Sequence, residues 1–384
     1  MIYLDNSATT RPCPACVRAM TEALTDCWGN PSSVYALGID AAHRLRQARQ
    51  AVAAALGAEP DRVFFTSGGT EADNWAILSA AERLGKRGRH IITTAVEHHA
   101  VLHPMQKLEA KGFEVTYLQP DHDGNITVEE LKKALRPDTI LVSVMMVNNE
   151  TGAVQPVGEI ARLIREKCPG ALFHVDGVQG FLRVPLAFDQ SGIDLYTCSG
   201  HKIHGPKGIG ALIARKGVRL NPRIEGGGQE KGLRSGTENT AGIAGFAAAA
   251  QWLAAQPKRF ETLRAEKLRL YARLRAEIPE LRVNGPDPES GVAAPHILNL
   301  SLGVRGEVML HALEAEGVYV GNGSACSTHK REMSAAFRAM NAGRQAAETA
   351  VRFSLGMMNT IEEMDAAADA VIRCYKTYAA FQRR

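Results

Sequence analysis

The chain has 384 residues, of which 45% are hydrophobic and 22% charged, a composition that excludes a mostly disordered protein. Its 45 basic and 41 acidic residues leave a formal net charge of +4, too small an excess to indicate nucleic-acid binding. The sequence has no run of about 18 apolar residues and no signal-peptide pattern at its start, so we expect a cytoplasmic protein. Seven Cys, an odd number, favour reduced thiols over a disulfide framework.

Strand and helix patterns alternate over the first two-thirds of the chain. Apolar and β-branched runs predict strands at 63–66, 90–96, 113–118, 139–147, 171–175, 195–198 and 208–214. Helical patterns lie between them at 70–84 and 157–167, and a capping box at 127–130 begins another helix. This alternation predicts an α/β domain with a mostly parallel sheet, which binds its ligands at the carboxyl ends of the strands.

The last third of the chain follows a different pattern. Long helical patterns at 240–255 and 260–277 precede a strand-like run at 296–301 and further helices. We therefore predict a large domain at 13–255 and a smaller α+β domain made of residues 1–12 and 256–384.

One Gly-rich turn lies where a predicted strand meets a helix. Ser67-Gly68-Gly69-Thr70 would present backbone N–H groups at a helix N-terminus, an arrangement that suits a phosphate. No Gly-Lys-Ser/Thr follows, so this turn is not a Walker P-loop. The alternative is a plain turn in which Thr70 caps the helix.

Two further strand ends carry an acid and a lysine. Asp176 ends an apolar strand, where a buried carboxylate needs a partner such as a protonated ring nitrogen; the alternative is a helix cap. Lys202 follows Cys198-Ser199-Gly200-His201 and would form a Schiff base if its surroundings lower its pKa; the alternative is a solvated loop lysine. The glycines at 205–210 do not have the spacing of a dinucleotide fingerprint.

A phosphate site, an acid for a ring nitrogen and a Schiff-base lysine are the contacts that pyridoxal phosphate (PLP) requires. Further motifs extend along nearly the whole chain, from Tyr3-Leu4-Asp5-Asn6-Ser7-Ala8-Thr9-Thr10 to Arg352-Phe353-Ser354-Leu355-Gly356. Those between them include Gly29-Asn30-Pro31-Ser32-Ser33, Thr94-Ala95-Val96-Glu97-His98, Val147-Asn148-Asn149-Glu150-Thr151-Gly152, Gly226-Gly227-Gly228-Gln229-Glu230, Arg234-Ser235-Gly236-Thr237 and Gly323-Ser324-Ala325-Cys326.

With these motifs the sequence resembles the class V, fold-type I PLP enzymes. Within them it is similar to the cysteine desulfurases of the nitrogen-fixation and iron–sulfur-assembly type. The resemblance implies a homodimer, and a large domain whose mostly parallel seven-stranded sheet is flanked by helices. It implies PLP as the cofactor and L-cysteine as the substrate, and no metal site is expected.

The resemblance also implies a role for each site residue. Lys202 would hold PLP as a Schiff base, Asp176 would pair with the ring nitrogen, and His98 would be a catalytic residue that stacks on the ring and moves protons. Asn149 and Gln179 would contact the ring, and Asn149 would also lie at the substrate. The expected phosphate ligands are Gly69, Thr70, Ser199, His201 and, across a dimer interface, Thr237. Arg352 would bind the substrate carboxylate through its guanidinium.

Cys326 is the expected nucleophile. It lies in a stretch of small and polar residues, whereas a free Cys is more often a small buried side chain. In the implied reaction Lys202 removes the α-proton of cysteine, and the Cys326 thiolate attacks the substrate sulfur. The products are L-alanine and a Cys326 persulfide, whose sulfur passes to an acceptor such as an iron–sulfur scaffold protein or to thiolated cofactors and tRNA.

Two other functions remain as alternatives. The first is a selenocysteine lyase or another lyase or aminotransferase of the same fold, and the second is a catalytically silent sulfur-relay scaffold. Cys326 opposes an aminotransferase, and the intact set of site residues opposes the scaffold. Cys13 and Cys16 form a C-x-x-C without a second copy, which we interpret as two structural thiols rather than a redox pair or half of a metal site.

Overall fold

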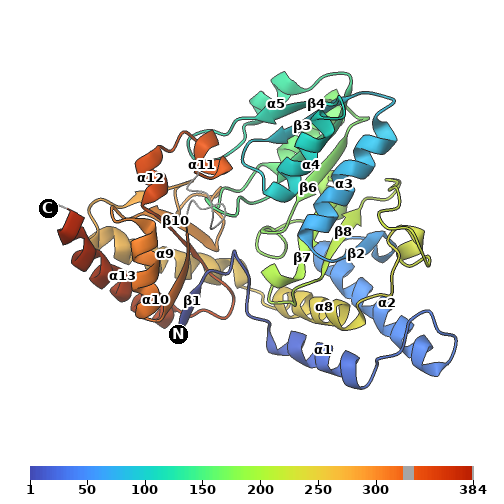
Figure 1. The fold of residues 1–384 in the computed structure, drawn as a ribbon, viewed down its shortest axis with the longest axis horizontal. Coiled ribbons are helices and arrows are strands. Elements are labelled where there is room, and N and C mark those ends of the chain that lie inside the picture. The colour runs from blue at the N-terminus through green and yellow to red at the C-terminus, as the bar shows by residue number, and fades with distance from the viewer. Residues whose placement is uncertain (323–332, 383–384) are drawn as a thin grey trace.

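The computed structural model describes residues 1–322 and 333–382, and these residues form two lobes (Figure 1). The larger lobe contains the helices α1 to α8 and most of the strands, whereas the smaller lobe contains α9 to α13. Both marked chain ends lie on the smaller lobe. Cys326 lies outside the described residues.

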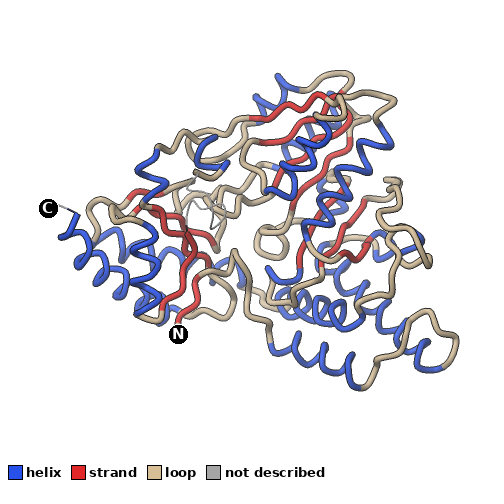
Figure 2. The backbone as a smooth tube through the Cα atoms, in the orientation of Figure 1, coloured by secondary structure: helices blue, strands red, loops and turns tan. Residues whose placement is uncertain are grey.

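The large lobe is built on a seven-stranded sheet with the order β2-β8-β7-β6-β5-β3-β4. Its strands are β2 (Val63–Thr66), β3 (His90–Thr94), β4 (Glu114–Leu118), β5 (Thr139–Met145), β6 (Leu172–Asp176), β7 (Leu195–Ser199) and β8 (Gly210–Ala214). Only β8 runs against its neighbours. The predicted seven-stranded, mostly parallel sheet is confirmed. Figure 2 shows the strands of the larger lobe in red.

Helices cover both faces of this sheet. They are α1 (Pro14–Thr25), α2 (Ala36–Leu56), α3 (Gly69–Leu84), α4 (His99–Glu109), α5 (Val128–Ala134), α6 (Val157–Lys167), the short α7 (Phe188–Ser191) and α8 (Thr240–Ala254). Buried side chains of α3 and α4 join the strands on one face. Those of α2, α6 and α8 join them on the other, because alternate strand residues point to opposite faces.

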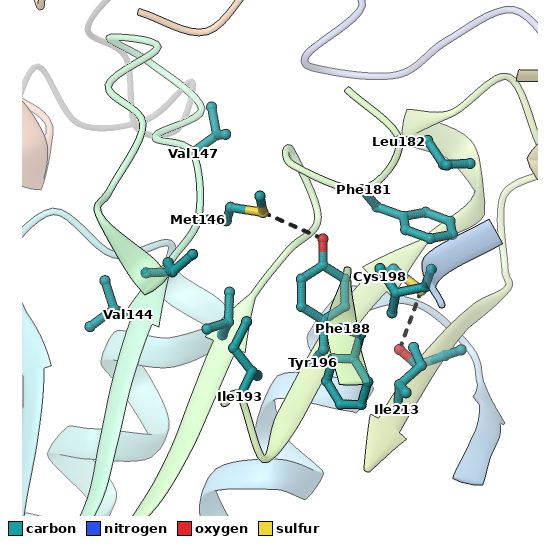
Figure 3. Packing of buried hydrophobic residues seen from close by; sticks show 14 of the residues in the cluster. Val144, Met146, Val147, Phe181, Leu182, Phe188, Ile193, Tyr196, Cys198 and Ile213 are labelled. Carbon is teal, nitrogen blue, oxygen red and sulfur yellow. Dashed lines mark hydrogen bonds between the residues drawn. The ribbon is translucent and has the colours of Figure 1, made fainter. Parts of the chain in front are cut away.

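The core behind the strand ends is tightly packed (Figure 3). Tyr196 is fully buried, and its hydroxyl points at the Met146 sulfur, 3.6 Å away. Phe181 and Phe188 both pack edge-on against the Tyr196 ring, with ring centroids 6.5 Å and 6.2 Å away. This packing fixes the turns that leave β6 and β7.

The small lobe contains a five-stranded sheet with the order β1-β11-β12-β10-β9. Its strands are β1 (Ile2–Leu4), β9 (Arg282–Val283), β10 (Ile297–Ser301), β11 (Val318–Asn322) and β12 (Ala350–Ser354), and its helices are α9 (Arg259–Glu277), α10 (Gly306–Ala315), α11 (Ala335–Ala339), α12 (Arg344–Glu348) and α13 (Ile361–Gln382). β1 pairs with β11, so residues 2–4 pack on this lobe. None of the described helices has the length and apolar composition needed to span a bilayer.

Predicted element bounds differ from the observed ones by a few residues. The expected capping box is half formed: the Thr127 hydroxyl accepts the Glu130 N–H, whereas the Glu130 carboxylate pairs with Lys133. Thr70 does not cap α3, because the helix already begins at Gly69. Asp176 is the last residue of β6 and caps no helix.

Candidate active site

A cavity of about 370 Å³ lies at the carboxyl ends of the large sheet. Its lining includes ten predicted site residues: Gly69, Thr70, His98, Asn149, Asp176, Gln179, Ser199, His201, Lys202 and Arg352. Thr237 is not among them, because it lies exposed on the loop before α8. The structure thus brings together every predicted residue that it describes except Thr237.

One end of the cavity is the start of α3. Gly68 has φ 156° and ψ −177°, a conformation essentially confined to glycine, and it turns the chain from β2 into the helix. A Cβ on Gly69 would lie 2.6 Å from Val178 Cγ2, so only glycine fits there without displacing Val178. The first N–H groups of a helix have no partner within the helix, so Gly69 and Thr70 can bind an anion beside Ser199 and His201.

The opposite wall carries a buried acid. The Asp176 carboxylate accepts the Val178 N–H at 2.9 Å. Burial, with the neighbouring Asp73, raises the pKa of Asp176 to about 7. A protonated ring nitrogen beside this carboxyl would offset the cost of its ionisation.

Lys202 ends the short 3₁₀ turn that follows β7, and its amine lies in the cavity. The amine donates to the carbonyl oxygens of Ser7 at 2.5 Å and Ala8 at 2.8 Å. Burial, together with Arg183 and Arg352, lowers the pKa of Lys202 to about 8, whereas Asp5 and Asp176 act in the opposite direction. A lysine with this pKa loses its proton near neutral pH, as a Schiff-base lysine or a general base must.

His98 is a neutral imidazole at the entrance of α4. Its Nδ1 accepts the Ala100 N–H at 3.1 Å, which leaves the proton on Nε2. Burial is the main cause that lowers the pKa of His98 to about 4, and the charge of Lys202 is the second. The ring can therefore stack on a planar ligand and donate one hydrogen bond from Nε2.

Arg352 reaches the cavity from β12 of the small lobe. Its Nη2 donates to Asp5 Oδ1 at 2.7 Å, and its Nη1 donates to the Asn149 carbonyl at 3.0 Å. Its Nε is buried and makes no hydrogen bond to any of the described residues. An arginine has five N–H donors, so the remaining ones can bind a carboxylate.

The sequence analysis missed several residues of the site. Asp73, one turn after Gly69 on α3, lines the cavity and lies 3.5 Å from His174 Nε2. Burial raises the pKa of Asp73 to about 7 and lowers that of His174 to about 4, so the imidazole is neutral and the carboxyl keeps its proton below about pH 7. The spacing of four residues from the Gly-rich turn could have indicated Asp73. The cavity lining also includes Ser7, Ala8, Met145, Val147 and Val178.

The residues present fit PLP. A buried carboxyl, a lysine with a lowered pKa and a helix N-terminus with a glycine cradle converge on one cavity, and each matches one part of the cofactor.

The family model of class-V aminotransferases matches residues 2–367. The chain belongs to this family. Members of the family use PLP, so the donor set of the cavity agrees with the comparison.

Similar proteins narrow the assignment to the cysteine desulfurases of the IscS and NifS type. The chain is 42% identical to "Cysteine desulfurase IscS" of Clostridium botulinum, over 95% of this chain and 91% of that one. A solved structure named "NIFS-LIKE PROTEIN" superposes with a TM-score of 0.90 at 36% identity, covering 98% of this chain and 99% of that one. The structure "SspA in complex with cysteine" matches with a TM-score of 0.79 at 32% identity, covering 94% and 100%.

Proposed function

We propose that this class-V enzyme is a cysteine desulfurase that takes sulfur from L-cysteine, releases L-alanine and passes the sulfur on from Cys326. The supporting observation is that a lysine with a lowered pKa, a buried acid and a guanidinium line one cavity in a chain 42% identical to a named cysteine desulfurase.

Each cavity residue has a place in this proposal. Gly69, Thr70, Ser199 and His201 would hold the cofactor phosphate, Asp176 the ring nitrogen, and Lys202 the aldehyde carbon. His98, Asn149 and Gln179 would contact the ring. PLP, when bound, draws electrons away from the substrate Cα and so makes the Cβ–S bond breakable.

Substrate binding and proton transfer fall to two other groups. Arg352 would bind the α-carboxylate through the donors that Asp5 and Asn149 leave free. Arg352 and Lys202 line the same cavity, so a substrate bound through its carboxylate would lie beside the lysine. The neutral amine of Lys202 would then take the α-proton, since its pKa of about 8 makes it a base near neutral pH.

Cys326 would accept the sulfur. Its thiolate forms a bond to the substrate sulfur while the Cβ–S bond breaks, and the electron pair of that bond goes to Cβ, which gains a proton to give alanine. The product on the enzyme is a persulfide. An acceptor protein, such as an iron–sulfur scaffold, would take the sulfur in turn, in keeping with the IscS type of its relatives.

We also propose that the protein acts as a homodimer. Large apolar side chains are exposed on and between α1 and α2: Val17, Leu24, Trp28, Val34, Tyr35, Leu37 and Ile39. Such a concentration is typical of an interface. Thr237, exposed on the loop before α8, would contact the phosphate in the partner subunit rather than in its own.

The test is to incubate the purified PLP-loaded protein with L-cysteine and a thiol reductant, and to measure alanine and sulfide. Cys326→Ala is the test variant, and Cys374→Ala, which changes a buried Cys in the small-lobe core, is the control. We expect both products from the wild type and the control and neither from Cys326→Ala. Turnover by Cys326→Ala would indicate a general β-lyase or a selenocysteine lyase. No alanine from a loaded wild type would contradict the proposal.

A further inference from the structure

Arg183 is a buried cation without an acidic partner among the residues that the structure describes. It lies in the turns that follow β6, and it is 2% exposed. Among the described residues no carboxylate forms an ion pair with it, and burial alone lowers its pKa, to about 9. A buried charge without a partner is costly, so its retention calls for a role.

The backbone next to Arg183 is also unusual. Leu182 has φ 59°, in the left-handed region that residues other than glycine rarely adopt. Its side chain is buried in the core beside Phe181 (Figure 3). Core packing thus holds a strained residue that directs the next side chain, Arg183, inward.

Arg183 closes a ring of hydrogen bonds around the cavity lysine. Its Nη2 donates to the Lys202 carbonyl, and its Nη1 donates to Gln179 Oε1 at 3.3 Å. Gln179 Nε2 donates to the Ser7 carbonyl at 3.0 Å, and that carbonyl also accepts from Lys202 Nζ at 2.5 Å. Arg183 therefore contacts two cavity residues from behind and does not line the cavity.

This ring determines which way the Gln179 amide faces. A guanidinium has donors only, so Gln179 must turn its oxygen toward Arg183. Its NH₂ group must then face the Ser7 carbonyl and the cavity. A donor at this position suits the phenolic oxygen of PLP, which accepts hydrogen bonds.

The charge of Arg183 acts on the same side of the cavity. Burial is the main cause of the lowered pKa of Lys202, and the charge of Arg183 is the second. The same two causes, in the same order, lower the pKa of His204 and His296. The other charged groups that act on the Lys202 amine are Arg352, which also opposes its protonation, and Asp5 and Asp176, which favour it. His98 and His201 stay neutral, since burial lowers the pKa of each to about 4.

We propose that Arg183 is a positioning residue that orients the Gln179 amide, anchors the main chain of Lys202 and supplies the positive potential behind the lysine amine. This inference rests on the proposed function, because it assigns Gln179 and Lys202 to the cofactor. The two tests below measure PLP binding and the protonation of Lys202, and neither requires catalytic turnover.

The first test is a double-mutant cycle on the dissociation constant of PLP, measured by equilibrium dialysis of the full-length apoprotein. The variants are Arg183→Met, Gln179→Leu and both together. Arg62→Met, alone and with Gln179→Leu, is the matched control, because Arg62 also donates to main-chain carbonyls but neither lines the cavity nor bonds to a residue that does. We expect Arg183→Met and Gln179→Leu each to raise the dissociation constant of PLP about tenfold. The double variant should also raise it about tenfold, rather than about a hundredfold.

The second test measures the protonation of Lys202 directly. The apoprotein is labelled with acetic anhydride over a pH series, and the Lys202 peptide is quantified by mass spectrometry. The wild-type midpoint is expected at about 8. Arg183→Met is expected to raise it by on the order of one pH unit, the effect of one like charge at short range, whereas Arg183→Lys and Arg62→Met keep it.

Several outcomes would overturn the proposal. These are an Arg183→Met variant that behaves like Arg62→Met, a double variant whose effect is the product of the single effects, or a Lys202 midpoint that does not move. If Arg183→Met does not fold, Arg183→Lys tests the proposal instead. In that variant the pH midpoint of Lys202 labelling should stay unchanged while the dissociation constant of PLP rises. If the wild type binds PLP but makes no alanine, the proposed function fails and these two readouts still test Arg183.

Discussion

Arg352 and Asp5 form an ion pair across 347 residues of sequence, with Arg352 Nη2 2.7 Å from Asp5 Oδ1. The pair joins the strand pairing of the small lobe to the cavity, because Arg352 lies on β12 and also donates to the Asn149 carbonyl of the large lobe. Gly321 of β11 pairs with Arg352 and lies directly against the ion pair. A Cβ there would be 2.6 Å from Asp5 Oδ1 and 2.8 Å from Arg352 Nη2.

Gly321→Ala should therefore destabilise the protein. Overpacking costs about 1–3 kcal/mol, and here the added methyl group must push apart a half-buried ion pair. The free energy of unfolding from urea titration measures the effect. Gly158→Ala, where a Cβ would meet nothing within 4 Å, should leave stability unchanged or raise it slightly, because Ala favours the helix α6 more than Gly does. Equal stability of the two variants would contradict this prediction.

Arg352→Lys should weaken substrate binding more than catalysis. A lysine keeps the charge but cannot form the two parallel hydrogen bonds of a guanidinium. We expect the KM for L-cysteine to rise about 10–100-fold, with kcat changing by less than about threefold. Steady-state alanine formation measures both, and Arg344→Lys, at an exposed pair with Glu348, is the control. A fall in kcat at constant KM would show that Arg352 does not bind the carboxylate.

Asp73→Asn should change how stability depends on pH. The folded state raises the pKa of Asp73 from 3.8 to about 7, so between these values the unfolded chain ionises while the folded chain keeps its proton. This carboxyl stabilises the fold below about pH 4, and the contribution is lost as the pH rises toward about 7. An amide needs no proton. The free energy of unfolding of the variant, relative to that of the wild type, should therefore rise by on the order of 1.4 kcal/mol per pH unit within this window.

Urea titrations of the apoprotein at several pH values measure this difference. Asp26→Asn, at an exposed carboxyl, should show a constant difference from the wild type. A constant difference for Asp73→Asn as well would mean that Asp73 is ionised in the folded state.

Glu71→Gln should weaken PLP binding without removing any residue of the cavity lining. Glu71 accepts the Ser67 N–H at 2.7 Å and the Arg234 Nε–H at 3.0 Å, and so ties the Gly-rich turn to the loop that carries Thr237. Loss of the carboxylate charge leaves Arg234 without its partner. We expect the PLP dissociation constant to rise about tenfold, measured by equilibrium dialysis. Glu82→Gln, on the exposed part of α3, should have no effect.

Local patterns predicted the large sheet and, in the cavity, the Gly-rich turn, Asp176 and Lys202; the other cavity residues were implied by the resemblance to the cysteine desulfurases. The helix at 157–167 matches α6 residue for residue, and Asp176, Ser199 and Lys202 lie at strand ends where apolar runs stop. Parallel strands bring such ends to one edge of the sheet, so residues far apart in sequence could be assigned to one site. The domain bounds at 13, 255 and 256 remain a prediction.

Contacts that depend on tertiary packing could not be predicted. Arg183 turns inward only because Leu182 adopts a left-handed conformation, and nothing in the local sequence indicates that. Asp5 reaches Arg352 only after β1 joins β11 at the edge of the small sheet. Cys326, the expected nucleophile, lies outside the described residues and also remains a prediction.

The first eight residues connect the two lobes. Their strand β1 belongs to the small sheet, whereas the carbonyls of Ser7 and Ala8 hold the Lys202 amine of the large lobe. Any shift of one lobe against the other would therefore displace the acceptors of the Lys202 amine. Deletion of residues 1–8 would therefore remove the edge strand β1 and both carbonyl acceptors of the Lys202 amine together.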